Sequence, residues 1–246
     1  MTACVDPSTG PALVHRSDPK TRLFDYQTGL RFWLSLDDVR LSRIVFVENS
    51  GYPLGSLEEI ARSENPLGKE VEFHTIPCNN YPAHLHYGYA ELSMLDAVVR
   101  CSDLVNQTQH FVKVNGRLIF PNLPRLLNRL PSDYLFAVDG RSNIASNWTL
   151  NTYVTTQLML FSTQFYLEHV LGQQRELMGE TGHLETFFYN VLVPFQGQRG
   201  ALLRWPINAP PVGEAAHWPK RYDSRRQVAV NAVRAVVRRV LPRLWL

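Results

Sequence analysis

Two apolar runs in the sequence end in side chains that can bind phosphate. Residues 111–117 (FVKVNGR) and 134–142 (YLFAVDGRS) each place a glycine beside an arginine where a strand-like stretch ends. Glycine lets the backbone approach a ligand closely, and a guanidinium donates two parallel hydrogen bonds to a phosphate. Either pair alone is common in ordinary loops, but two pairs at successive strand ends favour an anion site. The candidates for this site are Lys113, Gly116, Arg117, Asp139 and Arg141.

A second group of polar residues follows an earlier strand-like run. Residues 43–47 (RIVFV) are apolar and rich in β-branched side chains, and a short polar stretch follows them directly. Its side chains and exposed amides suit contacts to a nucleoside, and they suit a plain turn almost equally well. The candidates here are Glu48, Asn49, Ser50 and Gly51.

Aromatic and imidazole side chains gather between residues 81 and 91. Such a cluster is typical of surfaces that stack on sugar rings. The pair His84 and His86 could also bind a metal, but no third ligand lies nearby in the sequence, so we expect no metal site. Glu91 could bond to a donor or an acceptor, or merely begin a helix. The cluster comprises Tyr81, His84, His86 and Tyr87, and Tyr89 and Glu91 follow it.

The elements that must position these side chains alternate between strands and helices. Apolar runs predict strands at residues 43–47, 70–76, 111–117 and 134–142. Helical spacing and turn signals predict helices that begin at 56 and span 89–101, 122–131, 155–171 and 183–193. A strand, helix and strand in succession favour a parallel sheet with right-handed crossovers. Ligands of such α/β sheets bind beyond the carboxyl ends of the strands.

Composition indicates one α/β domain and excludes several other classes. The 246 residues are 45% hydrophobic and 19% charged, enough to bury one substantial core. No apolar run approaches twenty residues, and the amino-terminal residues do not resemble a signal peptide, so we expect a cytoplasmic protein. Cys4, Cys78 and Cys101 form no CxxC pair, which argues against a disulfide framework and a zinc site.

The net charge of +3 is concentrated at the carboxyl end. From Lys220 onward, Asp223 is the single acid among many arginines, and residues 225–246 interleave these with valines before ending in Leu244, Trp245 and Leu246. A basic helix of this kind suits an interfacial anchor on anionic lipid, while a helix packed on the domain is the commoner case in soluble proteins. We expect peripheral association with a membrane.

Several short segments together resemble a known family. They are residues 44–52 (IVFVENSGY), 88–91 (GYAE), 113–118 (KVNGRL) with 122–123, 139–141 (DGR) and 183–185 (HLE). In this succession the chain is similar to bacterial glycosyltransferases with a GT-A-like fold that build capsular and lipopolysaccharide O-antigen chains. The resemblance implies a Rossmann-like, mostly parallel central sheet flanked by helices, a nucleotide-sugar donor and a lipid-linked glycan acceptor. It suggests an irregular lead-in at 1–42, a catalytic domain at 43–196, a connector at 197–223 and a basic amphipathic helix at 224–246.

The chemistry of such a transfer assigns roles to the candidates. The diphosphate leaving group needs cations, which we assign to Lys113, Arg117 and Arg141. Many GT-A enzymes place a metal-binding Asp-x-Asp motif where this chain has Asp139 and Arg141, and one carboxylate is a poor site for a hard cation. We therefore expect a metal-independent transferase with no cofactor.

The acceptor hydroxyl must lose a proton, and Glu185 is the first candidate base, with Asp139 second and His183 third. Glu185 could equally serve only to stabilise the positive amino end of its helix. A single base suffices for transfer with inversion. The alternative is a non-catalytic binding or scaffolding subunit of a polysaccharide assembly complex. We expect no nucleic-acid partner, because no nucleic-acid-binding module accompanies the basic tail.

Overall fold

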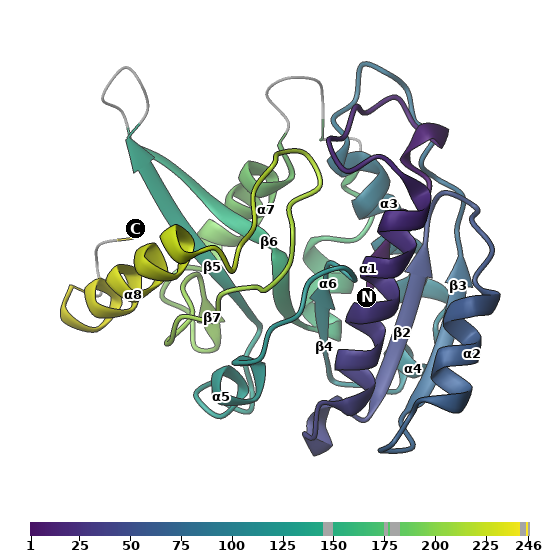
Figure 1. Cartoon of the computed structure of the whole chain (residues 1–246). Coiled ribbons are helices and arrows are strands. Elements are labelled where there is room, and N and C mark those ends of the chain that lie inside the picture. Colours follow the sequence, from purple (N-terminus) through teal and green to yellow (C-terminus); the bar gives the residue numbers. More distant parts are fainter. Residues whose placement is uncertain (145–149, 175–176, 178–182, 242–244, 246) are drawn as a thin grey trace.

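The computed structural model describes residues 1–144, 150–174, 177, 183–241 and 245, and it has two sheets (Figure 1). In the first sheet, β2 (Arg43–Glu48) and β3 (Glu70–Thr75) run parallel on either side of the crossover helix α2 (Gly55–Ser63). A short strand, β1 (Thr2–Ala3), pairs in parallel with the other edge of β2, which gives the order β1-β2-β3. The predicted strand-helix-strand unit is confirmed.

The second sheet has the order β4-β6-β5-β7. Its strands are β4 (His110–Val114), β5 (Phe136–Ile144), β6 (Leu150–Ser162) and β7 (Ala201–Leu202). β6 is antiparallel to β4 and β5, while β5 and β7 are parallel. A parallel bridge between Thr2 and Asn115 joins the two sheets at one point. The molecule has the expected α/β, Rossmann-like architecture, and the antiparallel strand β6 makes its second sheet mixed.

Helices cover both faces of the strands. One core contains side chains of α1 (Pro19–Ser35), α2 and α5 (Leu123–Leu127) packed on Phe46, Val114 and Leu158. The opposite core contains side chains of α3 (Gly88–Cys101), α6 (Thr163–His169) and α7 (Leu184–Leu192) packed on Phe136 and Met159. The alternation of side chains along each strand separates these two cores. Shorter pieces are α4 (Asp103–Asn106) and the 3₁₀ turns η1 (Pro7–Thr9), η2 (Val39–Leu41) and η5 (Val193–Phe195).

The expectation of an irregular lead-in at residues 1–42 is wrong. This segment contains β1 and the 17-residue helix α1, which begins at Pro19 with Asp18 as its N-cap. Asp18 accepts a hydrogen bond of 2.9 Å from the amide of Thr21, which stabilises the first turn. With only two residues, β1 shows no periodicity in the sequence, so it could not be recognised locally.

The prediction of a helix at residues 155–171 is also wrong over its first half, which forms a strand. β6 extends to Ser162, and α6 begins at Thr163 with Ser162 as its N-cap. Leu158, Met159, Leu160 and Phe161 are all fully buried between β4 and β5, with cores on both faces. A strand buried on both faces has no polar alternation, and its apolar run therefore resembles a buried helix.

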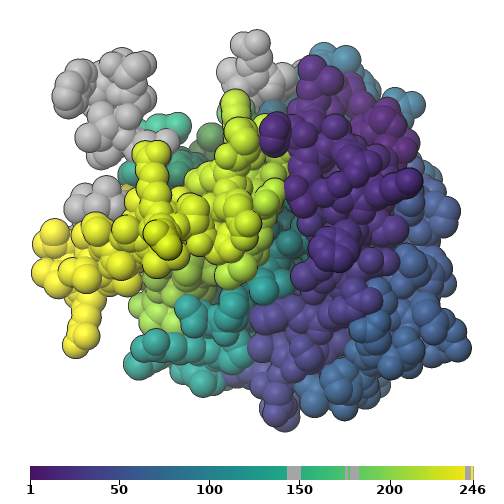
Figure 2. All heavy atoms as spheres, in the orientation of Figure 1, coloured from purple at the N-terminus to yellow at the C-terminus, as the bar shows by residue number. Residues whose placement is uncertain are grey.

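The carboxyl-terminal helix lies on the surface, at one side of the molecule in Figure 2. α8 (Arg225–Val240) has Ser224 as its N-cap, and the rest of the helix expected at 224–246 falls largely outside the described residues. The connector before it is mostly irregular, apart from β7. Within the part of the chain that the structure describes, no helix is long and apolar enough to span a membrane.

Candidate functional site

A cavity of about 310 Å³ lies beyond the carboxyl ends of β1, β2 and β4, and we call it the strand-end pocket. Asn49 enters it directly after β2, and Asn115 and Arg117 enter it directly after β4. β6 contributes Thr156 and α7 contributes Glu185. A ligand site in this position is what the topology of a parallel α/β sheet favours.

Two buried arginines make one end of the pocket cationic. The side chain of Arg117 is 7% exposed; it donates a 3.2 Å hydrogen bond to the carbonyl of Glu214 and lies 3.6 Å from Asp25. Arg22 of α1 is 4% exposed, and its hydrogen-bond acceptors are neutral oxygens of Cys4, Arg16 and Tyr26. No carboxylate among the described residues forms an ion pair with Arg22. A buried cation without a counter-ion is costly, so this end of the pocket favours an anionic ligand.

A close contact of two glycines brings α1 to the pocket. A Cβ on Gly29 would lie 2.1 Å from the carbonyl oxygen of Gly116, and a Cβ on Gly116 would lie 3.1 Å from Thr2. The absence of these side chains lets α1 pack directly on the loop after β4. The guanidinium groups of Arg22 and Arg117 each lie 6.0 Å from the centroid of the Tyr26 ring. Gly116 therefore acts through packing and does not line the pocket.

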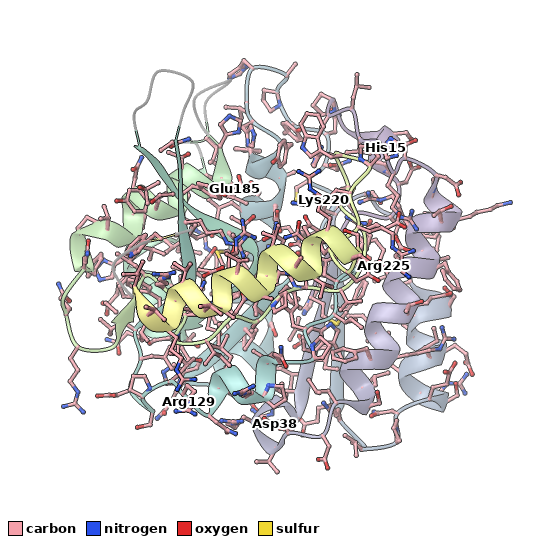
Figure 3. The ribbon with its side chains drawn as sticks, turned by 60° about the vertical axis from the view of Figure 1, so that its left-hand side comes forward. His15, Asp38, Arg129, Glu185, Lys220 and Arg225 are labelled. Atoms are coloured by element: carbon pink, nitrogen blue, oxygen red, sulfur yellow. The ribbon has the colours of Figure 1, made fainter. Side chains whose placement is uncertain are left out.

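Three carboxylates line the same pocket, and one of them, Glu214, is paired with Arg16 at 2.6 Å. Glu185, in the first turn of α7, accepts a 3.2 Å hydrogen bond from the Thr156 hydroxyl. Glu91 is paired with the buried ammonium of Lys113 and accepts a 3.3 Å hydrogen bond from Thr2. Glu185 forms no ion pair with the described residues, so its carboxylate is the freest of the three to accept a proton. Figure 3 labels Glu185, together with Lys220 of the connector.

Asn49 presents a polar atom that lacks a partner. It is 4% exposed, and its Oδ1 accepts no hydrogen bond within the described structure. Buried side-chain oxygens in proteins are nearly always hydrogen-bonded, so an orphan that lines a pocket points to a donor on a ligand. Tyr81 lines the pocket as well, and burial raises the pKa of its hydroxyl to about 12. This hydroxyl therefore remains a hydrogen-bond donor at neutral pH.

The connector between α7 and α8 passes over the pocket. The ring of His217 stacks on Tyr87 with centroids 4.3 Å apart, and the Tyr222 hydroxyl accepts a 3.4 Å hydrogen bond from Gln157. Burial lowers the pKa of His217, and the Arg22 and Arg117 cations act in the same direction, which favours a neutral imidazole. The aromatic part of the site is thus built from two segments that are far apart in the sequence.

Glu48, which was expected to contact the donor, does not line the strand-end pocket. Its carboxylate is fully buried and accepts hydrogen bonds from the amides of Val5, Ser50, Gly51 and Tyr52, at 2.8 to 3.1 Å, and from the Ser50 hydroxyl. Because these donors satisfy both oxygens, Glu48 holds the loops after β1 and β2 in place. Ser50 also accepts from Asp6, and Gly51 has φ +80°, the conformation of a turn glycine. Of the four residues predicted here, Asn49 lines the pocket.

The three cations expected to share one pocket are not brought together. Lys113 is 1% exposed at its side chain and donates 2.6 Å hydrogen bonds to Asn115 and to the carbonyl of Thr156, in addition to its pair with Glu91. Arg141 lies outside the pocket and pairs with Asp139 at 2.8 Å. Arg117 alone of the three lines the pocket, and Lys113 positions Glu91.

Asp139 is enclosed by arginines and is not available as a base. Its carboxylate is 0% exposed and accepts hydrogen bonds from Arg141 at 2.8 and 2.9 Å and from Arg238 of α8 at 2.6 Å. Burial opposes ionisation, but the two guanidinium groups prevail and lower the pKa of Asp139 below its ordinary value. Asp139 therefore acts as an anchor for α8.

The predicted sugar-binding cluster is divided by the fold. Tyr81, Tyr87 and Glu91 line the pocket, whereas His84, His86 and Tyr89 do not. His84 is exposed, and His86 is buried with its Nε2 3.0 Å from Nδ1 of His183. Burial, followed by the adjacent imidazoles of His183 and His217, lowers the pKa of His86 to about 4. The pair of His86 and His183 thus connects α7 to the loop before α3.

Sequence reasoning missed the contributions of the amino-terminal segment and the connector. Arg22 and Tyr26 belong to a helix that was not predicted, and His217 and Tyr222 belong to a segment read only as a linker. The recurrence of Arg22, Tyr26, Leu30 and Trp33 at intervals of three or four residues could have revealed α1. Nothing local in the connector indicates that it lies over a pocket.

Comparisons with known proteins identify no relative by sequence. No family model matches the chain, and no curated protein matches it. Two solved structures of HddC from Yersinia pseudotuberculosis, one of them complexed with GMP-PN, each align with 66% of this chain and 76% of theirs. Their sequence identities are 13% and 14%, and their TM-scores are 0.33 and 0.32. Similarity at this level carries no argument about function.

Proposed function

We propose that this protein is a glycosyltransferase that transfers a sugar from a nucleotide-sugar donor to a lipid-linked glycan acceptor in the synthesis of a bacterial surface polysaccharide. The observation that carries the proposal is the strand-end pocket, in which two buried arginines lie together with Glu185, whose carboxylate forms no ion pair with the described residues. Arg22 has no anionic partner among the described residues, and a donor diphosphate would supply one.

The residues around the pocket suggest how a donor lies in it. The diphosphate binds at Arg22 and Arg117, where a fixed positive charge stabilises the leaving group. The nucleoside lies by the loops after β1 and β2, where the free oxygen of Asn49 accepts a hydrogen bond. The transferred sugar then lies by Glu91 and Glu185, beneath the aromatic rings of Tyr87 and His217.

Transfer in this arrangement is a single displacement. The acceptor hydroxyl attacks the anomeric carbon, its proton passes to Glu185, and the bond from the anomeric carbon to the diphosphate oxygen breaks with its electrons leaving on the nucleoside diphosphate. One attack on the face opposite the leaving group inverts the configuration. Thr156 holds the Glu185 carboxylate by a 3.2 Å hydrogen bond, which fixes the direction of proton transfer.

Donor binding depends on Arg117, and a matched pair of variants tests this. We expect Arg117→Ala to lower kcat/KM for the donor about 10²-fold, because one fixed donor to the leaving group is lost. Asp25 keeps its partner Arg16, at 2.5 and 2.8 Å, so the variant leaves no buried carboxylate unpaired. The control Arg129→Ala removes an exposed arginine outside the pocket and should behave as wild type.

A panel of nucleotide sugars distinguishes the transferase from a scaffolding subunit. A donor at about one hundred times its Kd stabilises the native state by about 2.7 kcal/mol, which melting-temperature shifts detect readily. We expect one donor to raise the melting temperature of wild type and to be slowly hydrolysed by it. Binding without hydrolysis or transfer would favour the non-catalytic scaffold, and failure of every donor would remove the basis of the proposal.

Metal independence is a separate prediction. Asp139, which aligns with the metal-binding position in the glycosyltransferase family, is fully buried and held by Arg141 and Arg238, so it has no oxygen to offer a cation. We expect EDTA to change the rate of transfer less than about twofold. Loss of turnover in EDTA that manganese restores would contradict this part of the proposal.

The surface of α8 supports binding to an anionic membrane at the cytoplasmic face. Val228, Val233, Val236 and Val240 are 57% to 67% exposed, and they share the outward face of the helix. The inward face is polar: Arg238 bonds to Trp205 and Asp139, and the carbonyl of Asn231 accepts from Asn208. A helix on a soluble domain normally has the opposite arrangement.

Arginines lie beside the exposed valines of α8. Arg225, Arg226 and Arg239 are exposed, and each basic residue near an anionic lipid surface contributes about 1 kcal/mol. An apolar face flanked by cations suits insertion at the level of the headgroups. The helix would thus hold the strand-end pocket close to a lipid-linked acceptor.

Vesicle flotation tests this surface. We expect wild type to float with vesicles of phosphatidylethanolamine and phosphatidylglycerol, and the Val233→Asp and Val236→Asp double variant to lose about 90% of that binding, because charge on the inserted face opposes burial. Val39→Asp, at an even more exposed valine elsewhere, is the control. Point variants are preferable to removing residues 225–246, which would also remove Arg238 from Asp139. Equal flotation of the double variant and wild type would refute the membrane role.

A further inference from the structure

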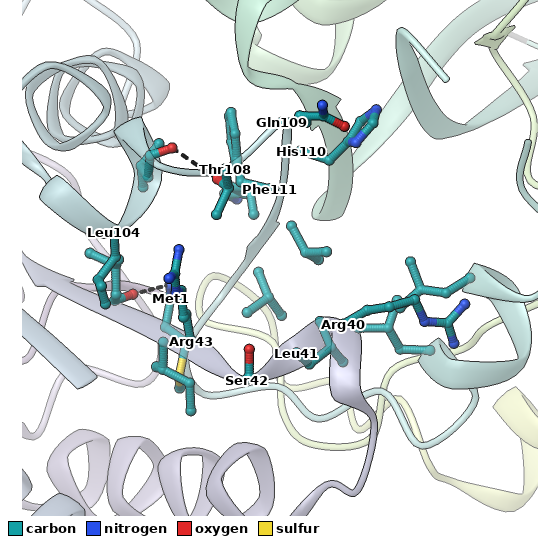
Figure 4. Close-up of a pocket in the computed structure, with 18 of the residues that line it drawn as sticks. Met1, Arg40, Leu41, Ser42, Arg43, Leu104, Thr108, Gln109, His110 and Phe111 are labelled. Carbon is teal, nitrogen blue, oxygen red and sulfur yellow. Dashed lines mark hydrogen bonds between the residues drawn. The ribbon is translucent and has the colours of Figure 1, made fainter. Parts of the chain in front are cut away.

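A second cavity, of about 730 Å³, lies between the two sheets and has no role in the proposed reaction. It separates β2 from β4 at the ends of these strands opposite the strand-end pocket, and Met1 is one of its lining residues (Figure 4). β1 occupies only two residues of the position between these strands. We call the remaining space the strand slot.

The strand slot lies between β2 and β4, and along part of their length no strand in the described part of the chain pairs with their facing edges. Val47 donates to the carbonyl of Met1, and the Met1 nitrogen donates to Val45 at 2.6 Å, so the odd residues of β2 face the slot. On the other side, Gly116 donates to the carbonyl of Thr2, so the even residues of β4 face it. The carbonyls of Val45 and Val114 accept from Met1 and Thr2, but below Met1 no described strand lies between β2 and β4 to pair with Arg43, with Val112 or with the amides of Val45 and Val114.

The faces of the strand slot are apolar and its outer mouth is polar. Helices α3 and α4 close one face with apolar side chains, and α1, α5 and their neighbours close the other with Trp33 and leucines. Ser42, Arg43 and Gln109 lie towards the mouth. The residues that close the two faces are Leu95, Val98, Val99, Leu104 and Val105 on one side and Trp33, Leu41, Leu123, Leu127 and Leu130 on the other.

We propose that the strand slot binds an extended apolar peptide segment of about four residues that is covalently joined to the nitrogen of Met1 and completes β1. The segment would belong to a longer form of this chain, and it would run parallel to β2 and β4. Interior parallel strands are apolar on both faces, and the lining of the slot matches that requirement.

The existing register specifies the contacts of this segment. Thr2 pairs with Val47 on one side and with Asn115 on the other. Continuing that register, the residue before Met1 lies between Val45 and Lys113, and its carbonyl accepts from the amide of Val114. The preceding residue lies opposite Ile44, and its carbonyl accepts from the amide of Val45.

A peptide satisfies the strand slot better than other occupants do. A lipid chain would fill the apolar volume but leave the edges of β2 and β4 without hydrogen bonds, at a cost for each buried group. A covalent connection would also avoid placing a charged amine at the buried nitrogen of Met1. Burial, followed by the nearby Lys113 cation, lowers the pKa of this amine to about 5. An amide nitrogen at the same place would carry no charge and keep the hydrogen bond to Val45.

Extended chains test the inference independently of any enzyme activity. The extension Val-Ile-Val-Val is placed between a new initiator methionine and Met1. It is compared with a Gly-Ser-Gly-Ser extension at the same position and with the unextended chain. We expect the apolar extension to raise the melting temperature by about 5 °C or more, since it buries several apolar side chains. We also expect it to slow hydrogen exchange at the amides of Val45 and Val114 at least about tenfold, while the Gly-Ser extension does neither.

Three outcomes would overturn the inference. The apolar extension could leave both readouts at the values of the Gly-Ser extension. The free acetylated peptide Val-Ile-Val-Val could reproduce the stabilisation in trans, which would assign the slot to a separate partner. Palmitate could stabilise the unextended chain while the apolar extension does not, which would assign the slot to a lipid. None of these outcomes bears on the strand-end pocket, so the proposed transfer reaction is judged separately.

Discussion

Replacing Glu185 with glutamine lowers kcat for sugar transfer about 10²- to 10⁴-fold, because the acceptor hydroxyl then has no carboxylate to receive its proton. Glutamine has the same shape and can still accept the 3.2 Å hydrogen bond from Thr156, so the local structure is retained. Since the change removes an interaction made only in the transition state, KM for the donor stays within about threefold of wild type. Initial rates measured with saturating donor and acceptor provide the test.

A control variant at another glutamate distinguishes this effect from a general loss of negative charge. Glu168 in α6 is an exposed carboxylate outside the pocket, and Glu168→Gln should retain wild-type kcat. Circular dichroism and donor-induced melting shifts establish that Glu185→Gln still folds and binds. Near-normal turnover in that folded variant would show that Glu185 only stabilises the amino end of α7.

Replacing Asp139 with asparagine destabilises the protein by about 3–5 kcal/mol without a specific effect on the chemical step. The substitution leaves Arg238, which is 7% exposed, without the carboxylate it contacts at 2.6 Å. Removing one partner of a buried ion pair is costly because the remaining charge stays out of water. For a chain of this size we expect the melting temperature to fall by about 10 °C. Thermal unfolding followed by circular dichroism measures this, and kcat of the folded protein at low temperature stays near wild type.

The pair of Arg221 and Asp223 is the matched control for Asp139. It has the same kind of contact, at 2.9 Å, but both groups are partly exposed. Solvent screens such a pair, so Asp223→Asn should cost less than about 1 kcal/mol. A large loss of kcat in folded Asp139→Asn would instead restore Asp139 as a catalytic base.

The lowered pKa of Asp139 also predicts that the stability of the folded protein depends on pH. Its pKa is lowered in the folded protein, so its contribution is fully present above the ordinary carboxyl pKa of about 4 and is lost as pH falls through the lower, folded value. Wild type should therefore lose stability steeply below about pH 4, and Asp139→Asn should lose less over the same interval. Urea midpoints measured across that range check the sign.

Several elements follow from local sequence alone. The strands 43–48, 70–75 and 110–114 and the helix 88–101 correspond closely to the predictions, because each carries its own period of apolar residues and its own polar ends. These elements sufficed to predict an α/β fold and a ligand site beyond the strand ends. β6 was misread because its burial on both faces removes the alternation that marks a strand.

The partners of each candidate side chain were decided by the tertiary structure. In the sequence Lys113 and Arg141 look like phosphate ligands and Asp139 looks like a candidate base, yet each is held by another residue of the chain. Asp139 and Arg238 are 99 positions apart, and no local pattern connects them. Arg22 gained importance because α1 packs through Gly29 against the loop after β4. Sequence determined which residues can carry charge at strand ends, whereas long-range packing determined which of those charges are neutralised within the protein and which remain available to a ligand.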